Sequence, residues 1–500
     1  MKKLYIFAVG GTGSRVLKAF TMLIAAGIKA ENGQTFQVVP IIIDPHSGNL
    51  DFQQTNRLLE NYMAIATDIG VDNGFFGTAI STLRDLNPAA SRLPSTFTYG
   101  LKKVLGAQFK EYIGYRGMNE ANQGLAEVLF SGDTVDKRNK PINLLDIEMD
   151  IGFIGNPNIG SVVLNQFKDS QEFKEFASSF TDQDRVFVIS SIFGGTGAAG
   201  FPIIVKNIRN AMMNSDIDGR GYLRRAKIGA LTVLPYFNIA PDPKSPIQKS
   251  VFIAKTKAAL SYYETNMHGS VDIMYYISDE LNGKAYKNDP GNGGQKNDAH
   301  FVELAAALSI FDYMGIRDDQ FSSENGQVLR PVYKEFGVKE KTADMRFVHL
   351  EDQTRDKIRT SLAQLVLFNK YLQKELRNTM DKQPFSIDAP KINAALTDQP
   401  FYNTHLTEFL EGFMRWLREM SDNKKAFSPF LPEAELNAII PENPAKTPWY
   451  WFSKFKYAHI NSLLNAHSKK GNYSSERQKL VHLFYHATKD TLRKFYKINS

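Results

Sequence analysis

Runs of hydrophobic residues alternate with amphipathic stretches along the first 315 residues. The clearest runs, rich in β-branched and aromatic residues, lie at 4–9, 38–43, 186–192, 228–234 and 271–277. The run at 186–192 predicts a strand that is buried on both faces, as in a parallel sheet, and the other runs predict further strands. Stretches with helical spacing follow them, at 16–23, 203–209, 255–263 and 299–308. This alternation predicts an α/β fold with helices against the sheet.

The pattern changes elsewhere in the chain. Residues 51–150 alternate amphipathic helical stretches, for example 56–65 and 121–129, with polar loops, and contain no evident catalytic motif. After a helix expected over 352–376, the remainder is helix-rich, with helices expected over 406–420, 433–440, 452–465 and 477–496. The proline-rich stretch 428–448 predicts a boundary.

Three glycine-rich segments adjoin these strands and helices. They are Gly10-Gly11-Thr12-Gly13-Ser14-Arg15, Gly155-Asn156-Pro157-Asn158-Ile159-Gly160, and Gly194-Gly195-Thr196-Gly197-Ala198. Glycines let backbone N–H groups approach phosphate oxygens closely, and the dipole of a following helix favours negative charge. Thr196 can add a hydroxyl donor, and Asn156 with Pro157 suits the start of a helix. The alternative for each segment alone is a tight turn that needs small residues for packing.

Length and composition set few further limits. Five hundred residues suggest about three domain-sized units. The chain has no cysteine, which excludes disulfides and thiolate chemistry. Without a hydrophobic run long enough for a membrane span, or a cleavage site behind the N-terminus, a cytoplasmic protein is the default expectation.

Positive charge is concentrated at the C-terminus. From Lys454 onward there are ten Lys or Arg residues but only Glu476 and Asp490 as acids, whereas the whole chain has a net charge of +7. The basic region could bind nucleic acid, an acidic membrane surface or an acidic partner protein. A solvated, lysine-rich helix face is the more ordinary outcome for such a segment. His482 and His486 have no evident third ligand, so we expect no metal site there.

The glycine-rich segments together resemble the phosphate loops of the tubulin/FtsZ superfamily of GTPases. Residues 194–198, after a Val-Phe-Val strand and before Pro202, are similar to the FtsZ nucleotide loop, and 155–160 is similar to its third phosphate loop. Phe193 and Ala198 depart from that pattern. The likeness covers roughly 1–315 and is that of a divergent bacterial tubulin-like protein.

The resemblance implies a Rossmann-type parallel sheet flanked by helices, with an inserted helical subdomain and a helix-rich C-terminal region. The nucleotide-binding domain would comprise 1–50 and 151–315, interrupted by a mostly helical insertion over 51–150. A divergent, largely helical second domain over 316–427 and the basic helical region 428–500 would follow.

The resemblance also implies GTP or GDP with Mg²⁺ as ligands. The three loops would hold the phosphates, and Asp44, after the second strand, would lie near the magnesium. Ser278 replaces the guanine-reading Asn of FtsZ, which weakens the expectation of strict guanine selectivity. Asn297 or Asp298 could face the base or instead cap the following helix. Arg15 stands where FtsZ has a base-contacting Asn and could reach a phosphate.

Head-to-tail self-assembly into a homo-polymer or homo-oligomer, with assembly-coupled GTP hydrolysis, is the activity that the resemblance implies. In the family, carboxylates of the next subunit help activate water. Candidates here are Asp352 and Asp356, with Glu351, Asp318 and Asp319 also considered. The alternative for the 351–356 group is an acidic helix start favoured by the helix dipole.

Two other functions remain open at this stage. The chain could be a nucleotide-binding regulatory scaffold in a bacterial multi-protein system, which neither hydrolyses nor polymerises and binds other proteins. It could also be a Rossmann-type oxidoreductase, since Gly11, Gly13 and Asp44 would suit a dinucleotide. Three separate phosphate loops argue against the oxidoreductase.

Overall fold

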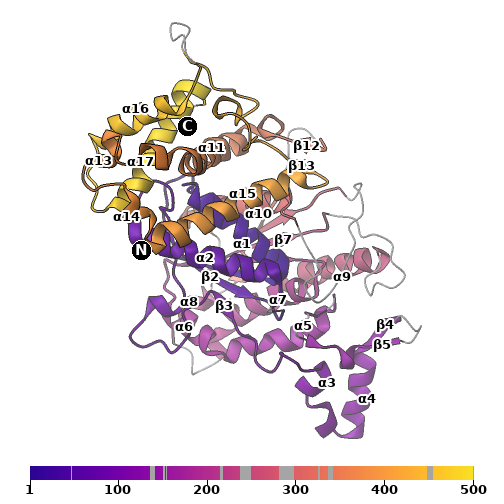
Figure 1. The fold of residues 1–500 in the computed structure, drawn as a ribbon. Coiled ribbons are helices and arrows are strands. Elements are labelled where there is room, and N and C mark those ends of the chain that lie inside the picture. The colour runs from indigo at the N-terminus through magenta and orange to yellow at the C-terminus, as the bar shows by residue number, and fades with distance from the viewer. Residues whose placement is uncertain are drawn as a thin grey trace.

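The computed structural model shows an α/β protein built on one seven-stranded sheet (Figure 1). It describes residues 1–46, 48–135, 141–149, 152–153, 155–213, 218–236, 249–280, 298–321, 323–324, 327–335, 342–447 and 454–498. The strand order is β11-β8-β7-β6-β1-β2-β3, and every neighbouring pair is parallel. The predicted parallel sheet flanked by helices is confirmed.

The five strands expected from the hydrophobic runs are all present. They are β1 (Lys3–Val9), β2 (Gln37–Ile43), β6 (Arg185–Ser191), β7 (Lys227–Val233) and β8 (Ile273–Ile277). Two short strands extend the sheet at its edges, β3 (Thr98–Tyr99) beside β2 and β11 (Val332–Glu335) beside β8. Neither edge strand was expected, because a segment of two to four residues carries too little hydrophobic pattern.

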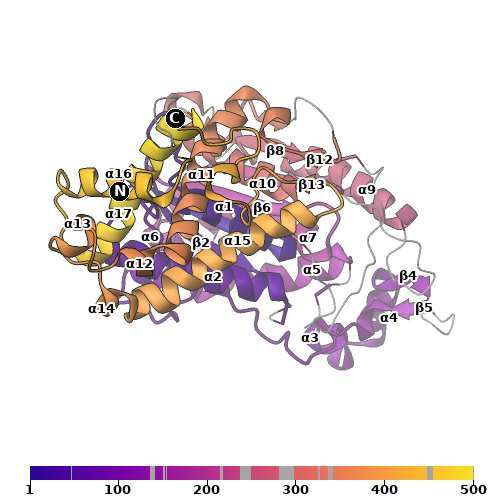
Figure 2. The same ribbon diagram turned by 45° about the horizontal axis from the view of Figure 1, so that its top comes forward.

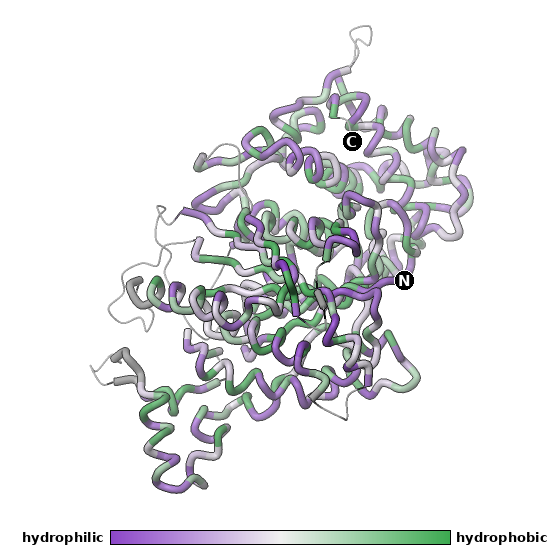
Figure 3. The backbone as a smooth tube through the Cα atoms, turned by 180° about the vertical axis from the view of Figure 1, so that it is seen from behind, coloured by the Kyte–Doolittle hydropathy of each residue, from purple (hydrophilic) through white to green (hydrophobic). Residues whose placement is uncertain are grey.

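The sheet separates two hydrophobic cores. Alternate residues of β1 divide between them, with Leu4, Ile6 and Ala8 on one face and Tyr5, Phe7 and Val9 on the other. The first core also includes residues of α1 (Gly10–Ala25), α2 (Leu50–Ile69) and α10 (Phe301–Gly315). The second includes residues of α5 (Pro157–Leu164), α6 (Gln171–Ser179), α7 (Gly195–Arg209), α8 (Arg220–Arg224) and α9 (Lys249–Met267). Hydrophobic residues are frequent in the central part of the molecule, where the strands lie (Figure 3).

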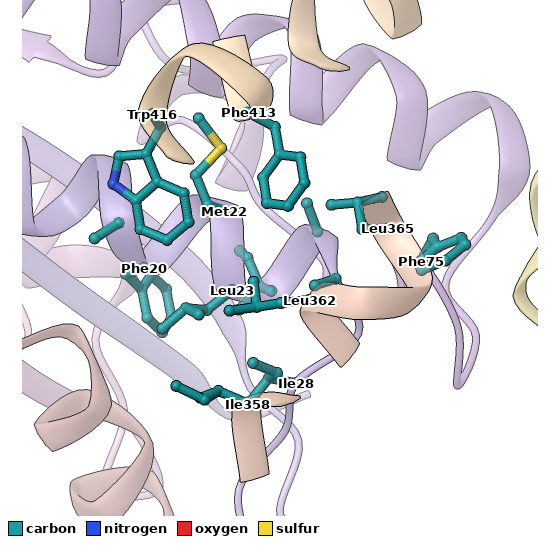
Figure 4. Packing of buried hydrophobic residues seen from close by; sticks show 14 of the residues in the cluster. Phe20, Met22, Leu23, Ile28, Phe75, Ile358, Leu362, Leu365, Phe413 and Trp416 are labelled. Atoms are coloured by element: carbon teal, nitrogen blue, oxygen red, sulfur yellow. The ribbon is translucent and has the colours of Figure 1, made fainter. Parts of the chain in front are cut away.

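The C-terminal helices share the first core and cover α1 and α2 (Figure 2). The main ones are α11 (Asp352–Lys374), α15 (Thr407–Asp422), α16 (Tyr457–Ser468) and α17 (Glu476–Thr491), with short helices α12 (Leu376–Thr379), α13 (Pro384–Ile387) and α14 (Ala394–Thr397) between them. Phe20 and Leu23 of α1 lie among Leu362 of α11 and Phe413 and Trp416 of α15 (Figure 4). The helix-rich C-terminal region is therefore joined to the sheet by a continuous core.

The segment 51–150 has two different parts. Its first part belongs to the body, because α2 packs on α1 and β3 joins the sheet. Helices α3 (Phe109–Tyr112) and α4 (Glu120–Leu129) and the pair β4 (Ser131–Val135) and β5 (Pro141–Asn143) project away from it (Figure 1). The division into domains, including this insertion, stays a prediction.

Small paired strands complete the second half of the chain, namely β9 (Ser323–Glu324) with β10 (Gln327–Val328) and β12 (Asp344–Met345) with β13 (Ala426–Phe427). One helix prediction is wrong. Only Leu436–Ala438 of the stretch 433–440 is helical, as a single 3₁₀ turn. Pro441 disfavours helical backbone at the residue before it, which favours an early end to the turn.

Candidate functional site: three glycine loops at one edge of the sheet

The strand order reverses direction between β1 and β6. The chain passes from β1 outward to β2, and later returns to place β6 on the other side of β1. In open parallel sheets, ligands bind beyond the carboxyl ends of the strands at such a reversal. Helix α1 begins directly after β1, at Gly10, and α7 begins at Gly195 after a short turn that follows β6, so both helix N-termini point to this place.

The three glycine-rich segments meet there. Gly10, with φ of +72°, lies against the segment after β6, since a Cβ on it would be 3.4 Å from the Cβ of Thr196. A Cβ on Gly195 would be 3.0 Å from the backbone N of Asn156 and 3.1 Å from that of Gly155. Residues that are distant in sequence thus form one glycine-lined edge, with α5 supplying a third helix start.

Some of these glycines are required by packing alone. A Cβ on Gly13 would lie 2.8 Å from the backbone carbon of Ala8, and one on Gly197 would lie 2.7 Å from the carbonyl oxygen of Ser191. Ser14 is buried and its hydroxyl donates to the Gly10 carbonyl. Other residues of the segments are half-exposed, so a ligand could reach them. These are Gly11, Gly155, Asn156, Gly194 and Thr196. Thr12 is buried.

Helix α7 begins earlier than its hydrophobic pattern predicts. It starts at Gly195, so Pro202 lies inside the helix and cannot donate to the carbonyl of Ala198. The hydroxyl of Tyr263, on α9, donates to that carbonyl at 3.0 Å. This contact allows the glycine-rich segment itself to be the first turn of the helix, with its N–H groups directed to the sheet edge.

Asp44 lies at the same edge, after β2. Its Oδ1 accepts the backbone N–H of His46 at 3.0 Å, and its side chain also interacts with Asn49. The amide Nδ2 of Asn49 would be 3.2 Å from a Cβ on Gly11, which connects Asp44 to the first loop. Burial raises the pKa of Asp44 to about 7. A single carboxylate beside phosphate oxygens fits Mg²⁺, which usually takes one or two carboxylates and completes its shell with phosphates and water.

Arg15 is held in a buried network. Its Nε donates to Glu303 at 2.6 Å, one terminal nitrogen donates to Asp51 at 3.1 Å, and the other donates to the hydroxyl of Tyr236 at 2.8 Å. Glu303 also accepts from the Tyr236 hydroxyl and from the backbone of His300. Each nitrogen of the guanidinium group therefore has a protein partner, and Arg15 links α1, α2, α10 and the segment after β7 beside the loops.

One of the residues considered for base recognition, Asp298, shortly precedes α10. His300 is its N-cap, because Nδ1 accepts the N–H of Val302 at 3.0 Å. Burial lowers the pKa of His300 to about 4, so the imidazole is neutral and can accept near pH 7. Asp298 therefore does not cap α10 and is exposed, as is Ser278 after β8. Asn297 lies outside the described residues.

Lys255 is a site residue that the sequence did not reveal. It lies on α9, and its Nζ donates to the carbonyl of Gly155 at 2.7 Å. A cation is thereby held against the third loop, where it would complement an anion placed at the helix starts. A lysine in a helix that is separated from the loop by about a hundred residues gives no motif, so only the tertiary structure identifies it.

The candidate catalytic carboxylates lie at the opposite edge of the sheet. Asp352 and Asp356 flank Arg355 at 2.8 and 2.9 Å near the start of α11. Lys357, the residue after Asp356, pairs at 3.4 Å with Glu31, which lies beyond the C-terminal end of α1. Since strands of seven residues span roughly 23 Å, these carboxylates do not meet the loops within one chain.

Asp318 is also at this edge, just after α10. It accepts from Lys2, Arg185 and Lys227 at 2.8 to 3.0 Å. Although burial raises the pKa of Asp318, these hydrogen bonds outweigh it and hold that pKa well below its ordinary value. Asp319 pairs with Arg317 at 3.2 Å, and its side chain is 71% exposed. Asp318 thus secures strand starts, whereas Asp319, Asp352 and Asp356 face solvent.

The described residues contain no group of three or more His, Asp or Glu side chains arranged to hold a metal ion. Among the same residues, no helix has the length and hydrophobicity needed to cross a membrane.

Comparison with known proteins gave similarities only among solved structures. No family model matches the chain, and no curated protein matches it. CetZ2 from Haloferax volcanii, described as a GTPgS-bound protofilament, is 12% identical with a TM-score of 0.30. CetZ from Methanosaeta thermophila and an empty FtsZ dimer from M. jannaschii are each 13% identical, with TM-scores of 0.26 and 0.25.

Each similarity covers only part of this chain and only part of the matched structure. They cover 63%, 56% and 56% of this chain and 58%, 46% and 45% of the three structures, so the match spans about half of their length. A likeness of this size concerns the fold alone.

Proposed function

We propose that this protein binds a nucleoside triphosphate through the three glycine loops. The observation that supports this most directly is the convergence of three helix starts at the strand-order reversal, where half-exposed glycines place backbone N–H groups around one point. Lys255 adds positive charge to this place, and Asp44 supplies a carboxylate for Mg²⁺.

GTP is the nucleotide we propose, on the resemblance of residues 155–160 and 194–198 to phosphate loops of the tubulin/FtsZ superfamily. The proposal for the phosphates has the firmer support, because it depends on backbone geometry. The buried network of Arg15 and Glu303 leaves guanine recognition to other groups, such as the exposed Ser278 and Asp298. We accordingly expect weaker discrimination between GTP and ATP than a dedicated base pocket would give.

Self-assembly and hydrolysis form the second part of the proposal. The loops at one edge and the exposed carboxylates Asp319, Asp352 and Asp356 at the other are suited to a head-to-tail contact between two copies of the chain. In such a contact, a carboxylate of one subunit would orient the water that attacks the γ-phosphate held by the next. The bacterial and cytoplasmic setting expected from the sequence stays a prediction.

The test combines binding, pelleting and phosphate release. Purified protein is titrated with fluorescent GTP, ATP and NADH, then centrifuged with GTP, GDP or no nucleotide while phosphate release is followed. Saturable GTP binding, GTP-dependent pelleting and release that rises with protein concentration are expected. Binding of GTP without pelleting or turnover would instead identify the regulatory scaffold, and NADH binding with no triphosphate binding would reject the proposal.

A further inference from the structure

Helix α4 presents a hydrophobic stripe to solvent. Leu125, Val128 and Leu129 recur at helical spacing on one side of this helix and are 55 to 73% exposed. The other side of the helix is in use, because the ring of Phe130, the residue after α4, packs on Phe109 at 4.7 Å. Exposed hydrophobic side chains gathered in this way mark a surface that contacts another macromolecule.

The projection that contains α4 stands at the end of the sheet with the glycine loops. The chain enters this projection after β3 and leaves it toward Gly155 of the third loop. Because β3 is parallel to β2, its last residue, Tyr99, lies at the carboxyl ends of the strands. Figures 1 and 2 both show α4 on one side of the molecule and α6 on the opposite side. Helix α4 therefore extends beyond the carboxyl ends of the strands.

A second exposed surface lies at the amino ends of the strands. Met212 follows the C-terminal end of α7, and Tyr222 is in α8, just before β7 starts at Lys227; both side chains are exposed. Ala126 of α4 and Leu223 of α8 belong to the same core, so the two surfaces are on the same side of the sheet. A head-to-tail repeat along the strands brings the α4 of one copy toward the α8 of the next.

The two surfaces also have opposite charge. Helix α4 contains Glu120 and Glu127, which are exposed, and no lysine or arginine. Residues 219–227, which include α8, contain three arginines and a lysine but no acid, and Arg224 and Arg225 are exposed. Opposite charges around a hydrophobic centre favour contact between α4 and α8 and disfavour contact between two α4 helices.

We infer that the hydrophobic stripe of α4 docks on the α8 end of a second copy of this chain. Met212 and Tyr222 of that copy would contact the stripe, and its arginines would face the glutamates of α4. The inference rests on the head-to-tail assembly proposed above and adds a contact outside the nucleotide site. Three side chains bury far less than the roughly 800 Å² per partner of a stable interface, so this contact supplements the one between the loops and the carboxylates.

Introduced cysteines test the contact without background, because the chain has no cysteine of its own. L125C protein and Y222C protein are mixed with GTP, oxidised briefly and separated by non-reducing electrophoresis. The mixture should give a disulfide-linked dimer, and each variant alone should remain a monomer. V348C is the matched control for Y222C, because Val348 is exposed near the start of α11, which packs in the other core. Mixed with L125C, it should give no dimer.

The pattern of crosslinks decides between outcomes. The double variant L125C/Y222C should give a ladder of oligomers, because a head-to-tail contact does not close on itself. A dimer of L125C alone would show that α4 pairs with α4 and would overturn the inference. To allow for disulfide geometry, V128C and M212C extend the test to four mixtures. If the proteins pellet with GTP and no mixture crosslinks, the inference is wrong and the assembly stands; if wild type never pellets, both fail.

Charge reversal tests the same contact without oxidation. E120K/E127K should raise the protein concentration needed for pelleting roughly tenfold, because like charges then face each other. The affinity for GTP and the thermal unfolding should stay unchanged, since both glutamates are exposed and distant from the loops. Adding R224E/R225E to the same chain should bring that concentration back to within about threefold of wild type. No recovery would show that α8 is not the partner of α4.

Discussion

The two ends of the parallel strands are built from different chemistry. We call the carboxyl ends, with the three glycine loops, the glycine edge, and the opposite ends the acidic edge. At the carboxyl ends of the strands, glycines bring backbone groups of three helix starts together, and the charged side chains nearby are buried and paired with one another. At the opposite edge, Asp318 joins Lys2, Arg185 and Lys227, and several carboxylates face solvent. The first edge offers donors to an anion, whereas the second offers acids.

The charge pairs at the two edges should therefore contribute differently to the free energy of unfolding. A buried pair that loses one partner leaves an uncompensated charge, whereas an exposed pair is screened by water. The glycine edge should therefore respond strongly to substitutions of its supporting charges, and the acidic edge should tolerate them. Comparable substitutions at the two edges test this contrast.

The largest effect is expected from R15M. The side chains of Glu303 and Asp51, 2% and 11% exposed, would lose their guanidinium partner, at a cost of about 3 to 5 kcal/mol in the free energy of unfolding. K2M at the other edge should cost less than about 1 kcal/mol, since Asp318 keeps two other cations. Urea denaturation measures both.

A double variant serves as the control for R15M. R15M/E303Q removes the buried charge while a glutamine can still accept the N–H of His300. It should recover part of the lost stability. If R15M and K2M destabilise equally, the contrast between the edges is wrong.

The next effect is a pH dependence that Asp44 imposes. Its pKa is raised from 3.8 to about 7, so between these values the folded state holds a proton that the unfolded state has released. Stability should therefore fall by about 1.4 kcal/mol per pH unit from about pH 4 to pH 7, and stay level above.

The variant D44N isolates this dependence. It should remove that slope and make the protein more stable than wild type by up to about 4 kcal/mol at pH 8. Thermal denaturation across the pH range measures the difference between the two proteins. Parallel pH profiles would show that Asp44 does not titrate as proposed.

How much of this the sequence predicts depends on the kind of interaction. The strands and the three loops were predicted because consecutive hydrophobic residues and glycines carry local conformational information. Their meeting at one edge follows from strand order. Lys255, the network of Arg15 with Glu303, and the pairing of Asp318 with Lys2 join residues 100 to 316 positions apart, and no local pattern records such contacts.

The starting residues of helices are only partly predictable from the sequence. Asp298 is an ordinary N-cap residue type, yet His300 caps α10 because its buried, neutral ring can accept a backbone N–H. In α7, the hydroxyl of Tyr263 compensates for Pro202, and this allows the helix to begin at Gly195. Both outcomes depend on partners that tertiary packing supplies.

Alanine substitutions at two glycines should separate an effect on folding from an effect on ligand binding. Gly10 and Gly33 have φ of +72° and +71°, but Gly10 is at the glycine edge and Gly33 lies between α1 and β2, with open space around it. G10A and G33A should each cost about 1 kcal/mol of stability. Only G10A should weaken GTP binding, roughly tenfold, because it shifts the first loop against Thr196. Equal affinities in a fluorescence titration would remove Gly10 from the site.

The smallest effect on stability is expected at the acidic edge. Asp352 and Asp356 are 68% and 56% exposed, so D352N/D356N should change the free energy of unfolding by less than about 0.5 kcal/mol. If these carboxylates act on the neighbouring subunit, the variant should still bind GTP but release phosphate at least about tenfold more slowly.

Mixing two variants distinguishes action between subunits from action within one. G10A has a weakened loop edge and D352N/D356N lacks the acidic edge, so at GTP concentrations well below the Kd of G10A each variant alone should release phosphate about tenfold more slowly than wild type. In an equal mixture, about one head-to-tail contact in four joins an intact loop edge to an intact acidic edge, and phosphate release should return to that fraction. D319N in place of D352N/D356N tests the other exposed carboxylate in the same assay. If neither mixture regains activity while wild type hydrolyses GTP, the acidic edge does not complete the site, and the comparison reduces to one functional edge and one structural edge.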